Sequence, residues 1–198
     1  MKMKRILAFF IDMMFVSFLS ASLVLLPVFH YNPEEQNDVL NEYVDKILES
    51  GSADLDEDEF VLVMHDYTYK GISLMVVSTT ITFLYFGILG FFFNGVTLGK
   101  KIMGIKIVPE YGDSLNPNLF ILREILVNGL VFKVIVILIT LLCKDVNSWY
   151  EIYNFVNTLS MVVMFAIYGF ILFRDDERGL HDLICRTRVV KIEKNEIE

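Results

Sequence analysis

Four long apolar runs, with most of the charged residues gathered between them, set the strongest constraint on the fold of this 198-residue chain. The runs cover residues 6–29, 72–93, 120–143 and 155–173. The hydrocarbon core of a bilayer is about 30 Å thick and needs about 20 apolar residues in a helix, which is close to the length of each run. Because backbone polar groups in lipid must pair within their own segment, we expect helices. The sequence therefore predicts an all-α membrane protein, a single domain over residues 1–198 built on a four-helix transmembrane bundle.

The first run could also be read as a secretory signal peptide. Basic residues at positions 2–5 precede it, and Ser20-Ala21-Ser22 resembles a cleavage site. However, the apolar run continues past that site to Leu26, and Asp12 lies inside it, where a signal peptide has no charge. We therefore favour a retained membrane helix.

The distribution of Lys and Arg predicts the orientation of the chain. These residues gather at the N-terminus, in the loop 94–118 and in the tail 174–198, whereas the other two loops hold only Lys46, Lys70 and Lys144. Loops rich in Lys and Arg stay on the cytoplasmic side. We therefore expect both termini in the cytoplasm.

The outer segment, residues 30–70, is predicted to be an acidic helical insertion. Asn32 and Pro33 are typical of a helix start, and Gly51 is a natural stop. The apolar residues between them share one helical face, which we expect to pack on the outer ends of the membrane helices or to lie at the interface. This segment has 12 acidic residues but only two lysines, so the net charge of −8 comes mostly from it, and nucleic acid is not an expected partner.

A second acidic run, residues 54–59, follows within the same segment. Its alternating aspartates could ligate Ca²⁺, but the glycine and the distal glutamate of an EF-hand loop are absent. We interpret the run as the start of a solvated helix and expect no metal site.

Ionisable residues inside the apolar runs are the main candidates for function, because a charge at membrane depth is costly. Asp12 lies seven residues after Arg5 on the same helical face, but Arg5 points to the cytoplasm, so a direct bridge between them would be strained. We expect Asp12 to meet a partner on another helix or a water molecule. The third run offers four candidates: Arg123, Glu124, Asn128 and Lys133. These groups could carry a proton or form a hydrogen-bonded knot, and for Lys133 we favour packing or oligomer contacts.

Two short alternating segments, residues 104–108 and 187–192, predict a small cytoplasmic two-stranded element. Between the last run and the second strand lie His181 and Asp182, which would diverge by about 100° on a helix. A His–Asp pair indicates catalysis only beside a nucleophile, and no nucleophile motif accompanies it. Residues 95–101 resemble a nucleotide-binding loop but lack its Ser or Thr. We therefore expect neither an enzyme nor a cofactor.

These motifs, taken in order, resemble the RDD family of bacterial multi-pass membrane proteins. The family is named for one Arg and two Asp residues, which match Arg5, Asp12 and Asp182. The second Asp closes a Gly-Leu-His-Asp motif, matched here by residues 179–182. The matching cytoplasmic positions are Gly99, Lys100, Gly179, His181 and Asp182. The resemblance implies a bacterial cell membrane protein, and the acidic outer segment departs from the shorter loops expected in this family.

Two functions are consistent with these features. The first is transport of a small ion or solute, including the cation–proton exchange attached to the resemblance, with Asp12 as the carrier. Four helices leave little room for such a path, so a homo-oligomer would be needed. The alternative is an accessory or assembly subunit, which would bind a partner membrane protein through the acidic outer segment while its polar residues hold the helices together.

Overall fold

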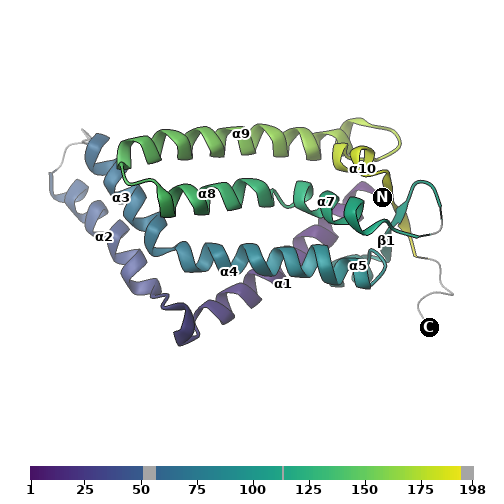
Figure 1. Ribbon diagram of the computed structural model, residues 1–198, viewed down its shortest axis with the longest axis horizontal. Helices are drawn as coiled ribbons and strands as arrows, with labels where there is room; N and C mark the ends of the chain where they lie inside the picture. The colour runs from purple at the N-terminus through teal and green to yellow at the C-terminus, as the bar shows by residue number, and fades with distance from the viewer. Residues whose placement is uncertain (51–56, 113, 193–198) are drawn as a thin grey trace.

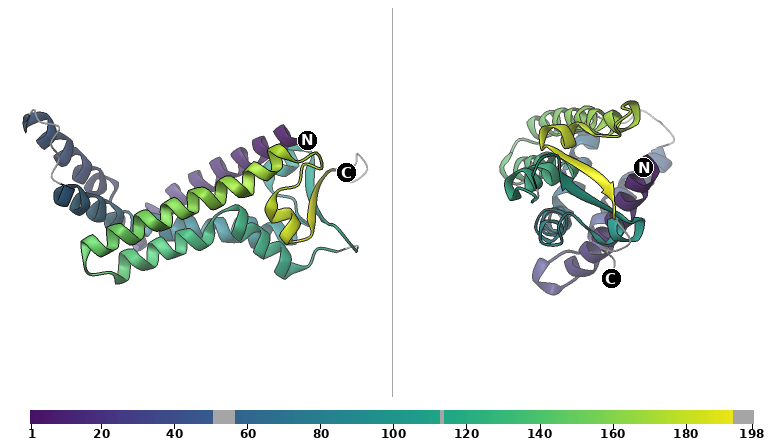
Figure 2. Two further views of the ribbon diagram at one scale, coloured as in Figure 1. Left: turned by 90° about the horizontal axis from the view of Figure 1, so that it is seen from above. Right: turned by 90° about the vertical axis from the view of Figure 1, so that its right-hand side faces the viewer.

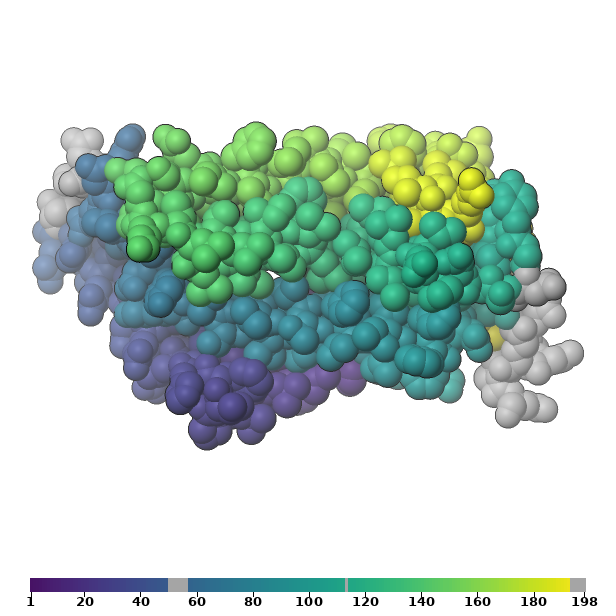
Figure 3. Space-filling view, viewed as in Figure 1, coloured from purple at the N-terminus to yellow at the C-terminus, as the bar shows by residue number. Residues whose placement is uncertain are grey.

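The computed structural model of the chain describes residues 1–50, 57–112 and 114–192, and most of these residues are helical. Long helices lie side by side, with the acidic outer helices at one end and both chain termini at the other (Figure 1). Three helical segments are long and apolar enough to cross a membrane: α1 (Lys2–Val24), the segment Ile72–Phe92 and α9 (Val146–Phe173). A fourth is added if the bent pair α7 (Pro117–Val127) and α8 (Leu130–Leu142) counts as one span. The space-filling view shows α9, then α7 with α8, then the segment of α4 as adjacent bands (Figure 3).

The third predicted span is broken, so the expectation of one continuous helix over residues 120–143 was wrong. α7 and α8 are bent by 65° relative to each other. The break lies at Asn128 and Gly129, and Gly129 has a φ of 59°, a left-handed conformation that favours glycine. α8 therefore starts in a new direction, and the break leaves polar backbone and the Asn128 side chain in the middle of an apolar run.

The other spans differ from the prediction mainly at their ends. α1 begins before residue 6 and ends at Val24, followed by a 3₁₀ turn, η1 (Pro27–Phe29), because proline cannot continue the helix. α9 begins at Val146, well before the predicted residue 155. Its start is capped by Asp145, whose carboxylate accepts from the backbone N–H of Ser148 at 2.9 Å.

The second span follows the predicted residues but changes its winding. α4 (Ile72–Thr82) passes into a π-helical segment, η2 (Phe83–Leu89), and then into α5 (Gly90–Phe92). π-Helical turns are rare and are frequent at functional sites. Here the wider turn carries the buried Tyr85 and Phe86.

The outer segment forms a helical hairpin that leaves the bundle at the end opposite the termini (Figure 2). It consists of α2 (Pro33–Ser50) and α3 (Glu57–Lys70), and residues 51–56, which hold the first half of the second acidic run, lie outside the described residues. The apolar face of α2 packs on α3, with the rings of Tyr43 and Phe60 6.2 Å apart. α3 in turn packs on α9, so it is α3 that connects α2 to the bundle.

The predicted pair of strands is present at the end where the termini lie. β1 (Ile105–Pro109) and β2 (Thr187–Lys191) are antiparallel, with Ile107 opposite Val189. A short helix precedes each strand: α6 (Leu98–Met103) before β1 and α10 (Leu180–Ile184) before β2. The strands pack on Ala8 of α1 and Phe120 of α7, so the small sheet closes this end of the bundle.

The packing of α6 on α1 requires glycine at position 99. A Cβ atom there would lie 2.2 Å from the backbone oxygen of Ala8 and 2.9 Å from Cγ of Asp12. Neither neighbour can move away cheaply, because one is helix backbone and the other is buried. The two helices therefore meet at backbone contact distance.

We predict that Gly99→Ala destabilises the protein by roughly 3 kcal/mol or more, because the added methyl group pushes α6 away from α1. In detergent this should lower the midpoint of thermal unfolding by about 6 °C or more. The matched control is Gly169→Ala in α9, where an added Cβ meets only Phe173 at 4.0 Å. The control should unfold at the temperature of the wild type or above it, and equal midpoints for the two variants would contradict the close packing.

Candidate functional site

Asp12 is completely buried and accepts hydrogen bonds from three groups on other segments. Its Oδ1 accepts from the hydroxyl of Tyr85 at 2.6 Å and from the backbone N–H of Gly99 at 2.7 Å. Its Oδ2 accepts from the hydroxyl of Thr97. This one carboxylate therefore ties α1 to the π-helical segment and to the start of α6.

Asp12 meets its partners on other segments of the chain, as expected, but the candidates of the third span are not among them. Asp12 lies on the face of α1 that packs against α4 and α6. That face points toward Tyr85 and the loop before α6, and Arg123 and Glu124 meet other groups. Tyr85 was missed because a tyrosine within an apolar run gives no signal of its role.

A second group of charges is centred on Asp182, which is also completely buried. Its Oδ2 lies 2.5 Å from Nη2 of Arg5, and its Oδ1 lies 3.0 Å from Nη2 of Arg123. Oδ2 also accepts from the backbone N–H of Gly179 at 3.0 Å, which caps α10. Burial alone would raise the pKa of Asp182, but Arg123 and Arg5 outweigh burial and hold it far below its usual range. Asp182 therefore stays ionised and connects α1, α7 and α10.

His181 and Asp182 do not diverge as their adjacency on a helix predicted. Nε2 of His181 lies 3.3 Å from Oδ1 of Asp182 because α10 is short and the Asp182 side chain turns back toward its N-terminus. Burial lowers the pKa of His181 below its ordinary value, and the hydrogen bond to Asp182 opposes that shift only in part. The imidazole is therefore neutral at physiological pH.

Glu124 and Lys100 extend this group of charges toward Asp12. The Glu124 carboxylate contacts Nη1 of Arg123, and Nζ of Lys100 lies 3.8 Å from its Oε1. The Lys100 side chain is only 13% exposed. Burial lowers the pKa of Lys100 from its ordinary value, and the Glu124 carboxylate opposes that shift only in part. Lys100 is thus a weakly paired, desolvated ammonium group between two acidic residues.

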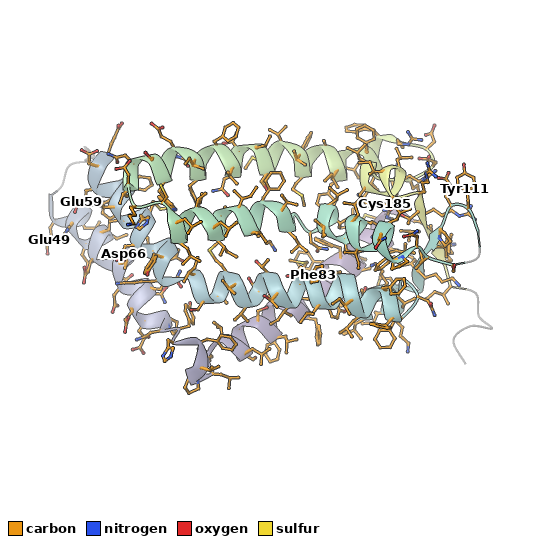
Figure 4. All side chains as sticks on the ribbon, in the orientation of Figure 1. Glu49, Glu59, Asp66, Phe83, Tyr111 and Cys185 are labelled. Atoms are coloured by element: carbon orange, nitrogen blue, oxygen red, sulfur yellow. The ribbon has the colours of Figure 1, made fainter. Side chains whose placement is uncertain are left out.

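These charged groups surround a cavity of about 330 Å³ at the end of the bundle where the termini lie. Figure 4 shows the side chains of this region, close to the labelled Cys185. The walls from α1 and α9 are mainly apolar, with Ile6, Phe9 and Leu172 among their residues. The cavity is also lined by seven ionisable side chains: Arg5, Asp12, Lys100, Arg123, Glu124, Tyr168 and His181. The surface that faces the cavity is mostly apolar, and the charged groups beside it pair mainly with one another.

Two residues predicted from the third span lie further into the bundle. The Asn128 amide donates to the backbone oxygen of Glu124 at 2.8 Å, and its Oδ1 is buried with no hydrogen-bond partner among the described residues. Lys133 is half-buried and, within the same described ranges, has no ion pair or hydrogen bond. Within the described residues, Lys133 therefore lies outside both the group of charges around Asp182 and the hydrogen bonds of Asp12. In the part of the chain that the structure describes, no three His, Cys, Asp or Glu side chains are grouped to hold a metal ion.

The neutral state of His181 predicts a pH-dependent stability. The unfolded chain binds a proton on this histidine below its ordinary pKa of 6.5, whereas the folded chain does so only at lower pH. Because the unfolded state then binds more protons, folding stability falls as the pH drops through that window. The melting temperature in detergent should fall more between about pH 7.5 and about pH 5 for the wild type than for His181→Gln. Parallel curves for the two proteins would contradict a buried neutral imidazole.

Comparison with known proteins agrees with this arrangement. The model of the RDD family matches residues 2–186, which include Arg5, Asp12 and Asp182. The chain is also similar to the uncharacterized protein YxaI of Bacillus subtilis (strain 168), with 30% identity over 117 residues. That match covers 59% of this chain and 56% of the relative, so the chain spans little more than half the length of that protein. No solved structure matches the chain.

The family match covers nearly the whole chain, and its apolar helices suggest a membrane protein. Of the three residues for which the family is named, Arg5 and Asp12 line the cavity, and Asp182 pairs with Arg5. The chain belongs to the RDD family.

Proposed function

We propose that this chain exchanges a small monovalent cation for a proton across the bacterial cell membrane, with the exchange site at the cavity described above. The observation that carries the proposal is a balance of charges at the cavity. Three cationic side chains, Arg5, Lys100 and Arg123, meet three acidic ones, Asp12, Glu124 and Asp182. If one cationic group gives up its proton, the site holds one uncompensated negative charge, and a buried uncompensated charge is strongly unfavourable. A cation entering the cavity would restore the balance.

Lys100 is better suited than Asp12 to be the group that loses its proton. If the Asp12 carboxylate were to turn away, all three donors would lose their acceptor, and a proton bound to it would compete with the donors for one of its two oxygens. Lys100 has one ion pair, at 3.8 Å, and burial already lowers its pKa. We therefore assign to Asp12 a positioning role and to Lys100 the exchangeable proton.

Glu124 and Asn128 would supply oxygen ligands for the cation. Small hard cations prefer carboxylate and amide oxygens. Oε2 of Glu124 lies 3.4 Å from the amide nitrogen of Asn128, and Oδ1 of Asn128 is buried without a donor. Broken helices near the middle of a membrane are common ion sites in transporters, and the α7–α8 break lies at this residue.

The proposed orientation places the basic end of the bundle, with the cavity and both termini, in the cytoplasm. The N-terminus and β2 lie at the same end (Figure 1), as an even number of spans requires. Under this proposal the chain has no enzymatic activity and needs no cofactor.

Lys100→Arg is expected to abolish exchange. Arginine keeps the positive charge but does not release its proton in proteins. In proteoliposomes loaded with a pH-sensitive dye, proton movement driven by Na⁺, Li⁺ or K⁺ gradients should fall roughly tenfold or more relative to the wild type. The matched control is Lys101→Arg, because Lys101 is exposed on the same short helix.

Unchanged proton movement in Lys100→Arg would overturn the assignment of the exchangeable proton to this residue. The melting temperature of both variants should be measured beside the flux, so that a loss of flux in a folded protein can be distinguished from unfolding.

The alternative of an accessory subunit rests on the outer hairpin. α2 and α3 project from the bundle (Figure 2), and Leu48 on α2 is 72% exposed. We favour exchange because the charged cavity has a composition that partner binding through the hairpin does not explain.

A further inference from the structure

Lys133 points into the bundle although it lies in the most apolar helix of the chain. On α8 the buried residues are Leu130, Val136 and Thr140, three residues before Lys133, three after it and seven after it. These spacings bring them to the same helical face as Lys133. The exposed residues of α8, such as Val134 and Leu138, lie on another face. The lysine stem therefore runs along the interior side of α8.

The neighbouring helices offer this ammonium group no counter-charge. α4 packs on α8 and has no ionisable side chain. α9 also packs on α8, and from residue 154 to its end Tyr168 is its only ionisable side chain. The Tyr168 hydroxyl donates to the backbone oxygen of Val127 at 2.8 Å. α7 places its charges at the cavity, and α3, with His65 and Asp66, reaches the outer end of α8. An unpaired ionisable group at this depth is a functional candidate.

The direction of the Lys133 side chain leads toward the cavity. A helical side chain leans toward the N-terminus of its own helix, and for α8 that end is the break at Asn128 and Gly129. The buried Oδ1 of Asn128 lacks a donor there, within the described residues. From Asn128 the polar contacts continue to Glu124 at 3.4 Å and from Glu124 to Lys100 at 3.8 Å. Asn128, Glu124 and Lys100 thus form a polar series that begins at the N-terminal end of α8, the end toward which the Lys133 side chain leans.

We propose that Lys133 is the proton-carrying residue between the outer half of the bundle and the exchange site, an inference that rests on the proposed function. In this step an N–H bond of the Lys133 ammonium breaks, and its proton passes to a water molecule hydrogen-bonded to Oδ1 of Asn128. That water gives a proton to the neutral amine of Lys100, which becomes an ammonium group as the cation leaves. Lys133 is left as a neutral amine and takes its next proton from the outer side. No electron is transferred, and each proton given up by one amine is taken up by the other.

The outer part of the same face continues in polar side chains. The indole N–H of Trp149 donates to the hydroxyl of Thr140 at 3.1 Å, and the Trp149 ring meets the His65 ring edge-on at 4.8 Å. His65 belongs to α3, whose first turn is acidic. A proton entering from the outer side would therefore reach Lys133 past groups that can form hydrogen bonds.

The test compares Lys133→Met with Lys144→Met. Lys144 is exposed beyond the end of α8, so it serves as the matched control. In proteoliposomes with a Na⁺, Li⁺ or K⁺ gradient, the rate of proton movement in Lys133→Met should be roughly tenfold or more below that of the wild type. The rate in Lys144→Met should equal that of the wild type. Lys133→Met should still be stabilised against heat by the chloride salt of the same cation, because the cation site at Glu124 is intact. Lys133→Arg, a second variant that keeps the charge, should lose proton movement as well.

The outcomes separate this inference from the proposed function. Normal proton movement in Lys133→Met, with loss in Lys100→Arg, would overturn the role of Lys133 and leave the exchange site standing. Absence of cation-driven proton movement in the wild type would overturn both. If Lys133 only packs, Lys133→Met should be more stable and fully active, and that result would also contradict the proposal.

Discussion

The ion pairs of Asp182 hold together the end of the molecule where the termini and the cavity lie. One buried carboxylate joins Arg5 of α1, Arg123 of α7 and the start of α10. Removing one partner of a buried ion pair typically costs about 3–5 kcal/mol, because the remaining charge is left uncompensated. These contacts position α1 and α7 around the cavity, and they bring β2 beneath the bundle, where it pairs with β1.

Asp12, seven residues after Arg5 on α1, also joins several segments of the chain. Its three donors come from the π-helical segment and from the loop and helix that follow the second span. Together, Asp12 and Asp182 leave Lys100 as the less constrained charge, because its ion pair with Glu124 is 3.8 Å long, whereas Glu124 also contacts Arg123 closely. A rigid polar frame around a loosely paired lysine is what an exchange site requires, since the frame keeps its shape while one proton leaves.

Much of the fold could be predicted from the sequence because its signals are local. The apolar runs predicted the long helices, alternation predicted the two strands, and Asn32 and Pro33 predicted the start of α2. The break in the third span was missed although Asn128-Gly129 is a common turn pair, because the length of the apolar run outweighed a two-residue signal. The pairing of Arg5 with Asp182 could not be derived either, since it depends on how the chain returns to α1 after α9. The residues of the family motif were identified, but Tyr85 was not, because only the π-helical turn directs it at Asp12.

The most direct test of the proposed exchange measures whether it moves net charge across the membrane. If one proton leaves for each monovalent cation that enters, exchange moves no net charge. In proteoliposomes of the wild-type protein, an imposed Na⁺ or Li⁺ gradient should move protons in the opposite direction. The rate should be the same whether or not the membrane potential is clamped to zero with K⁺ and an ionophore. Proton movement that follows the membrane potential, or no movement with either cation, would contradict a balanced exchange at Lys100 and Glu124.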